Sequence, residues 1–249
     1  MAGSPNSQSS QKTVAVVLSP MRSGSTLLKA LLAVPADVSN LPETNFQRFA
    51  TGADPRLARM APEPILVLKR PCWFTEIGSY PKIPSGPNVR RIILARDCYE
   101  VVSSVKRMAL RGFHPFIGWM FDDYLINHYW AGVYDRLTQM TGPDTHLVRY
   151  EDLVENPIEH TAALFQFIGS THTEGIDGYN PPGDYSWKWG QDDGSDRIKS
   201  LKVCSRKKPR VDHRLLRRIA RSSRVAEIQA RLNYGPAAKE KIDAPATQS

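Results

Sequence analysis

The chain has 249 residues, of which 41% are hydrophobic and 23% are charged. These proportions are typical of a globular protein and exclude a largely disordered chain, and the length is sufficient for a hydrophobic core. No apolar stretch approaches the ~18 residues that a membrane-spanning helix needs, so we expect no membrane span. The 33 Lys and Arg outnumber the 25 Asp and Glu, and the net charge of +8 favours an anionic partner: a nucleotide, a nucleic acid or an acidic surface.

The two ends of the chain differ in composition from the region between them. Residues 1–12 are rich in Ser, Gln, Asn and Gly and have no apolar core, which predicts a disordered tail and neither a signal peptide nor a transit peptide. Residues 235–249 predict a flexible tail, so a single domain over 13–234 remains. The three cysteines show no paired spacing, which predicts neither a disulfide framework nor a zinc site and favours a reducing, cytoplasmic location.

Four short apolar runs separate longer helical patterns. These runs predict strands of a mostly parallel sheet, and they cover Val14–Ser19, Ile65–Lys69, Arg91–Arg96 and His146–Tyr150. Strands that alternate with helices indicate an α/β fold in which helices flank a central, mostly parallel sheet in three layers. The stretch 169–210 is rich in Gly, Pro and Asp and is too long for a passive connector, so we expect a binding segment there.

The predicted helices begin and end at recognisable signals. A leucine repeat at helical spacing follows Gly24, and Asp97 with Glu100 forms a capping box that opens a helix running to about residue 111. Asn156 and Pro157 supply an N-cap and a first-turn proline for the next short helix. The patterns predict further helices over 116–140 and over 213–232, the latter interrupted at 222–223.

The loop after the first predicted strand has the composition of an anion-binding site. Because it leads from a strand into a helix, the free N–H groups and the dipole of that helix favour negative charge. Gly24 allows a close backbone approach, Arg22 adds a cation, and hydroxyl donors come from Ser23, Ser25 and Thr26. The alternative is a simple Ser/Gly cap of the helix, which the position at a strand–helix junction disfavours.

A nucleotide kinase or NTPase is the first enzyme class to consider for such a loop. The usual phosphate loop reads G-x-x-x-x-G-K-[ST], with a lysine on the phosphates and a hydroxyl on magnesium. Here the upstream glycine is missing and Ser25 stands where that lysine would be. A magnesium-dependent phosphotransferase built on this loop therefore remains only as an alternative.

The sequence around this loop resembles that of sulfotransferases that use 3′-phosphoadenosine 5′-phosphosulfate (PAPS). Residues 20–28, Pro-Met-Arg-Ser-Gly-Ser-Thr-Leu-Leu, are similar to the loop that binds the 5′-phosphosulfate in this family. Residues 91–104, with Arg96 at a strand end and Ser104 eight residues later, look like the 3′-phosphate motif. Residues 148–153 and 232–234 are also similar to family signatures. The resemblance covers nearly the whole predicted domain and implies a P-loop-like fold that binds PAPS as co-substrate.

The spacing between Arg96 and Ser104 has a physical reason. Ser104 lies about two turns into the helix that Asp97 caps, so an arginine fork and a hydroxyl can converge on one phosphate. The resemblance therefore assigns the 3′-phosphate to Arg96 and Ser104, and the 5′-phosphosulfate to the loop from Arg22 to Thr26.

Sulfuryl transfer needs a base for the acceptor and positive charge on the leaving phosphate, and it needs no metal. The resemblance is to the bacterial and Golgi-type branch, and it implies that Glu43 is the general base; the alternative is an exposed loop acid. Lys69 closes the second predicted strand, at the sheet edge where ligands bind. The resemblance assigns it, with Arg22, to the transferring sulfuryl group.

A late segment and a basic region complete the candidate binding surface. The segment 187–200 is expected to fold over the nucleotide, and the resemblance suggests cofactor contacts by Ser195, Arg197 and Lys199. The basic region over 202–224 admits nucleic-acid binding as an alternative. We expect no nucleic-acid partner, because the helix there has an ordinary buried stripe of Leu and Ile and no known nucleic-acid module accompanies it.

The acceptor side of the site is rich in aromatic residues. The stretch 112–134 predicts either an apolar pocket or a core helix, and Trp73 and Phe74 are further pocket candidates. We expect a hydroxyl-bearing acceptor, which can be a small molecule, a glycan or a peptide. The sequence leaves that choice and the oligomeric state open.

Overall fold

The structure is a computed structural model that describes residues 11–76, 82–109, 121–181, 199–204 and 211–235. The remaining residues include most of both predicted tails and most of the predicted covering segment, so these predictions lie outside the described residues. Within the described part, no helix is long and apolar enough to cross a membrane.

A four-stranded sheet forms the centre of the domain. Its strands are all parallel and follow the order β2-β1-β3-β4. They span Thr13–Leu18 (β1), Ile65–Lys69 (β2), Val89–Ala95 (β3) and Thr145–Arg149 (β4). All four predicted strands are therefore confirmed, with ends that differ by no more than two residues.

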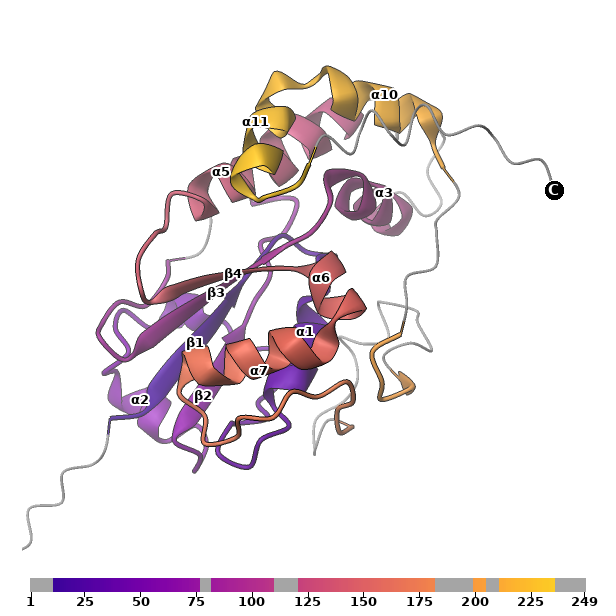
Figure 1. Ribbon diagram of the computed structural model, residues 1–249. Coiled ribbons are helices and arrows are strands. Elements are labelled where there is room, and N and C mark those ends of the chain that lie inside the picture. Colours follow the sequence, from indigo (N-terminus) through magenta and orange to yellow (C-terminus); the bar gives the residue numbers. More distant parts are fainter. Residues whose placement is uncertain (1–10, 77–81, 110–120, 182–198, 205–210, 236–249) are drawn as a thin grey trace, which may run out of the picture.

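Helices cover both faces of the sheet because successive side chains of a strand point to opposite faces. Val14, Val16 and Leu18 of β1 belong to one core, whereas Ala15 and Val17 belong to the other. The first core includes helices α3 (Cys98–Ala109), α5 (Ala131–Leu137), α10 (His213–Arg221) and α11 (Ser223–Arg231). The second core includes α1 (Ser25–Leu32), α6 (Tyr150–Glu155) and α7 (Pro157–Ile168). Figure 1 shows the two groups of helices on opposite sides of the sheet, which confirms the three-layer α/β prediction.

The helix boundaries follow the predicted signals closely. The Glu100 N–H donates to Asp97 Oδ1 at 3.1 Å at the start of α3, and α7 begins at Pro157. The predicted break near residue 222 is real, because Ser222 accepts a hydrogen bond from the Val225 N–H and so caps α11. Two short elements, η1 (Phe46–Arg48) and α2 (Pro55–Ala58), lie between α1 and β2 and were not predicted.

The predicted helix over 116–140 contains a π-helical stretch that was not predicted. In its described part, residues 124–130 form a π-helix, η2 (Tyr124–Trp130), before α5 continues to Leu137. Tyr129 and Trp130 at the end of η2 are fully buried and donate hydrogen bonds to main-chain carbonyls of the loops after β2 and β3. A π-helical turn shifts the direction of its side chains relative to an α-helix, and this shift accompanies functional sites frequently.

Candidate active site

The loop between β1 and α1 has the backbone shape of an anion-binding corner. Gly24 is the N-cap of α1 and adopts a left-handed conformation with φ 92°, and Arg22 is also left-handed with φ 67°. Gly24 has no side chain that could cap the helix, so no cap side chain occupies the first N–H groups of α1. The predicted Ser/Gly-rich corner at a strand–helix junction is therefore present, while the anion it would bind stays a prediction.

Tyr150, the first residue of α6, explains why residue 24 is a glycine. A Cβ atom on Gly24 would lie 2.3 Å from Cδ2 of the Tyr150 ring. The same ring also packs against the guanidinium of Arg96, whose Cζ lies 4.2 Å from the ring centroid. Tyr150 thus joins the loop after β1 to the residue that follows β3.

The predicted 3′-phosphate residues converge with the first loop. Arg96 donates from Nη1 to the Arg22 carbonyl oxygen at 2.8 Å, and Arg22 donates from Nε to Ser104 Oγ at 3.0 Å. The Nη2 atom of Arg96 lies 3.6 Å from a Glu100 carboxylate oxygen. Its Nε is buried and has no hydrogen-bond partner among the described residues, so this guanidinium retains a donor.

Glu43 and Lys69, to which the resemblance assigns the roles of base and cation, are in direct contact. Lys69 Nζ lies 2.6 Å from Glu43 Oε2 and donates to Thr26 Oγ1 at 3.2 Å. Both side chains are largely buried, with 6% of Lys69 and 10% of Glu43 exposed. Three segments meet at this point: the first turn of α1, the loop after α1 and the end of β2. The arrangement contradicts the alternative of an isolated, exposed loop acid.

Three aromatic side chains of η2 and α5 form hydrogen bonds with the loops that follow β1, β2 and β3. Tyr129 accepts from the Met21 N–H at 2.7 Å and donates to the Cys72 carbonyl, while Trp130 Nε1 donates to the Arg96 carbonyl at 3.0 Å. The Tyr134 hydroxyl accepts a hydrogen bond from the Arg96 N–H, donates one to the Leu94 carbonyl of β3, and lies 3.4 Å from the Ser23 hydroxyl. Burial raises the pKa of the Tyr134 hydroxyl. Tyr129, Trp130 and Tyr134 are therefore core residues that support the site and do not line a pocket, whereas Phe121 of the same stretch is exposed.

The last two sequence blocks with family resemblance pack against each other. Glu151 accepts from the Tyr234 hydroxyl at 2.6 Å and from the Asp97 N–H at 3.2 Å. Arg149 pairs with Asp152 through two 2.6 Å contacts and stacks on the Tyr234 ring. The C-terminal block therefore holds the strand end that carries Arg96 in place.

Comparison with known proteins shows which proteins this chain is similar to. A family model described as "Sulfotransferase family" matches residues 56–174, the segment from α2 through β2, β3 and β4 to the end of α7. Over these residues the chain is similar to members of that family. No curated protein matches the sequence.

Solved structures of sulfotransferases share this fold. The sulfotransferase domain from the curacin biosynthetic pathway is 19% identical, with a TM-score of 0.56 over 90% of this chain and 98% of that domain. A sulfotransferase from Alicyclobacillus acidocaldarius is 13% identical, with a TM-score of 0.55 over 89% of this chain and 94% of that protein. The domain thus has the P-loop-like fold of these sulfotransferases, in agreement with the predicted fold.

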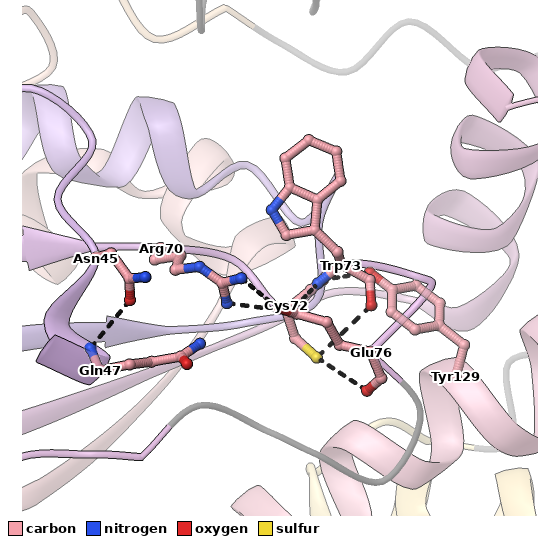
Figure 2. A network of polar contacts seen from close by, with 7 residues as sticks. All are labelled: Asn45, Gln47, Arg70, Cys72, Trp73, Glu76 and Tyr129. Atoms are coloured by element: carbon pink, nitrogen blue, oxygen red, sulfur yellow. Dashed lines mark hydrogen bonds and ion pairs between the residues drawn. The ribbon is translucent and has the colours of Figure 1, made fainter.

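The loop that directly follows Lys69 is held by an ion pair and a hydrogen bond. Figure 2 shows Arg70 paired with both carboxylate oxygens of Glu76, which also accepts from the Trp73 N–H at 2.9 Å. The indole of Trp73 points away from this network and is 37% exposed. Burial, with the Glu76 charge, raises the pKa of the Cys72 thiol to about 12, so this cysteine is a structural residue and no nucleophile.

Only one of the three cofactor contacts predicted in the late segment falls within the described residues. Ser195 and Arg197 lie outside the described residues, and Lys199 is exposed, so the roles given to these three stay predictions. The stripe predicted for the basic helix is confirmed in α10, where Leu215, Leu216 and Ile219 are all buried.

Sequence reasoning missed two residues of this site. Tyr150 belongs to a block that resembles a family signature, but nothing in the sequence indicates that its ring contacts Gly24 and Arg96. Lys29 lies within the leucine repeat of α1, and the signal that could have singled it out is that a lysine among buried leucines is unusual. Its side chain donates to Asn40 Oδ1 at 2.6 Å, close to the Glu43–Lys69 pair.

Proposed function

We propose that this protein is a sulfotransferase that transfers a sulfuryl group from PAPS to the hydroxyl of an acceptor. The observation that carries the proposal is the contact of Arg22 with Ser104 and Arg96, which joins the corner after β1 to the corner after β3, with the Glu43–Lys69 pair beside the first corner. A donor with negative groups at both its 5′ and 3′ positions matches two such corners, whereas ADP has no 3′-phosphate to place at Arg96.

The residues of the first corner would bind the 5′-phosphosulfate. The N–H groups at the start of α1 and the hydroxyls of Ser23, Ser25 and Thr26 supply donors, and Arg22 supplies positive charge. The buried Nε of Arg96 and the hydroxyl of Ser104 would bind the 3′-phosphate.

The transfer step is a single in-line displacement. The acceptor oxygen attacks sulfur, the bond between sulfur and the 5′-phosphate oxygen breaks, and the acceptor proton passes to the Glu43 carboxylate. Lys69 stabilises the negative charge that develops on the transferring group and on the leaving phosphate, together with Arg22. The contact of Lys69 with both Glu43 and Thr26 supports this assignment, because one lysine bridges the base and the donor-binding loop.

The reaction is tested by incubating the protein with PAPS and pooled alcohols, phenols, sugars and peptides. Mass spectrometry then detects any product heavier than its acceptor by one SO₃ group. The proposal predicts at least one such product and release of adenosine 3′,5′-bisphosphate. Failure of every hydroxyl acceptor, with transfer to an amine only, would contradict the assignment of the acceptor class.

The donor assignment has a test of its own, with a matched pair of serines on α3. Ser104→Ala is expected to weaken binding of adenosine 3′,5′-bisphosphate about tenfold and to leave ADP binding unchanged, because one hydrogen bond to a charged group is lost. Ser103→Ala is the control, since Ser103 Oγ donates to the Glu100 carbonyl within the helix. Magnesium-dependent ADP binding that ignores the 3′-phosphate would instead support a phosphotransferase.

We also propose that the enzyme works in a reducing compartment such as the cytoplasm. Its three cysteines are unpaired, and Cys72 and Cys98 are buried. Burial raises the pKa of both thiols, which keeps them protonated and slow to oxidise.

A further inference from the structure

Lys29 is a buried lysine next to the proposed reaction centre. It lies one turn after Thr26 on α1, and only 7% of it is exposed. Burial, together with the positive charge of Lys69, lowers the pKa of Lys29 to about 7. Its Nζ donates to Asn40 Oδ1 at 2.6 Å. An amine donates this hydrogen bond whether it is charged or neutral, so the contact persists in both protonation states.

Asn40 belongs to the segment that carries Glu43. This segment is anchored to β2 at both ends: Ser39 Oγ accepts from the Val67 N–H at 3.1 Å, and the Thr44 N–H donates to the Lys69 carbonyl at 3.1 Å. Between these anchors, the hydrogen bond from Lys29 to Asn40 attaches the segment to α1. The Lys29–Asn40 contact, three residues before Glu43, is therefore one of the contacts that hold this segment.

Two adjacent turns of α1 hold the Glu43–Lys69 pair from the same side. Thr26 accepts from Lys69, and Lys29 holds the segment that carries Glu43. A buried lysine costs free energy that a leucine or methionine would not, so core packing alone does not account for an amine at this position. The hydrogen bond to Asn40, on the segment that carries Glu43, does account for a lysine at position 29.

We propose that Lys29 is a positioning residue of the sulfuryl-transfer site, which aligns Glu43 through Asn40. The inference rests on the proposed function, in which Glu43 is the base. Lys29 itself touches no reacting atom and acts through the geometry of the Asn40–Glu43 segment. Removing either end of the Lys29–Asn40 contact should therefore slow transfer without weakening donor binding.

The test uses two variants that break the same contact from opposite ends. Lys29→Met removes the donor and keeps the length and the apolar packing of the side chain. Asn40→Ala removes the acceptor of the same hydrogen bond. Each is expected to lower kcat about tenfold or more, with the Kd for adenosine 3′,5′-bisphosphate unchanged within about threefold. Leu31→Met, a volume-conserving change in another buried residue of α1, is the control for packing and should leave kcat unchanged. Wild-type kcat in both contact variants would overturn the proposal.

A second measurement shows whether Lys29 acts through Glu43. In a Glu43→Gln background, the additional Lys29→Met change should reduce residual turnover by less than about twofold, because the base that it positions is already lost. The same loss in both backgrounds would mean that Lys29 acts by another route and would overturn the proposal.

The structure of the Lys29→Met protein provides a result that does not depend on turnover. We expect the Asn40–Glu43 segment to move and the 2.6 Å contact between Glu43 and Lys69 to be lost. An unmoved segment with that contact intact would overturn the positioning role. If instead wild-type protein transfers no sulfuryl group from PAPS, the proposed function fails, and the structural result still decides the role of Lys29.

Discussion

The packing of Tyr150 between Gly24 and Arg96 makes Gly24→Ala the most informative single substitution. A Cβ at position 24 would lie 2.3 and 2.4 Å from two atoms of the Tyr150 ring, so the ring must move. Since Arg96 stacks on the same ring, a change in the first corner should be transmitted to the second. One methyl group is thus expected to damage both proposed anion-binding corners.

The structure contains a control that separates backbone strain from this collision. Gly24 and Gly169 both adopt left-handed conformations, with φ 92° and 77°, but a Cβ at Gly169 meets nothing within 4 Å. An alanine in this conformation costs ~1–2 kcal/mol at either position. Displacing the Tyr150 ring and weakening its cation–π contact with Arg96 adds ~1–2 kcal/mol at position 24 only. Gly24→Ala should therefore lower the free energy of unfolding by ~2–4 kcal/mol, about twice the loss for Gly169→Ala.

Urea denaturation and calorimetric titration measure the two consequences. Gly169→Ala should bind adenosine 3′,5′-bisphosphate as the wild type does. Gly24→Ala should bind it at least about tenfold more weakly, because a displaced Arg96 loses a charge-assisted hydrogen bond. Equal losses of stability in the two variants, or wild-type affinity in Gly24→Ala, would refute the linkage of the two corners through Tyr150.

Three further predictions concern the base, a buried amine and the C-terminal block. Glu43→Gln should reduce turnover by about a hundredfold or more with near-normal nucleotide affinity; unchanged turnover in a steady-state assay would remove Glu43 from the role of base. Lys29 has a folded pKa of about 7 against a usual value of 10.5, so the unfolded chain holds more protons between these pH values and stability rises with pH in that window. Urea titrations at several pH values should show a rise of up to ~1.4 kcal/mol per pH unit that Lys29→Met abolishes, and an equal slope in both proteins would speak against it. Tyr234→Phe should cost ~1–3 kcal/mol of stability in the same assay, because Glu151 loses a buried donor; a loss no greater than that of an exposed Tyr→Phe change would disagree.

Local patterns carried most of the fold. The apolar runs of β1 and β2 were predicted because strands covered on both faces need apolar side chains at nearly every position, whereas β4, at an edge of the sheet, is only partly buried. The signals at Asp97, Pro157 and Ser222 placed the helix starts, since each acts within one turn of its own residue. The η2 π-helix escaped prediction because its side chains contact loops far away in the sequence, which periodicity does not reveal.

The site residues likewise divide into those that a local sequence block reveals and those that only tertiary packing brings together. The loop from Arg22 to Thr26 is a contiguous block, so sequence reasoning could place all of it. Glu43 and Lys69 were assigned from the family resemblance in separate segments, and only the parallel pairing of β1 with β2 and the return of the chain after α1 bring them into contact. The role of Tyr150 depends on packing between α6, the first loop and the end of β3, and no local pattern encodes that.

The most direct test of the whole account is a crystal structure of the protein with adenosine 3′,5′-bisphosphate. The account predicts the 5′-phosphate against the N–H groups that follow Gly24, and the 3′-phosphate within hydrogen-bond distance of Arg96 Nε and Ser104 Oγ. A nucleotide bound at any other edge of the sheet, or with its 3′-phosphate in solvent, would contradict it.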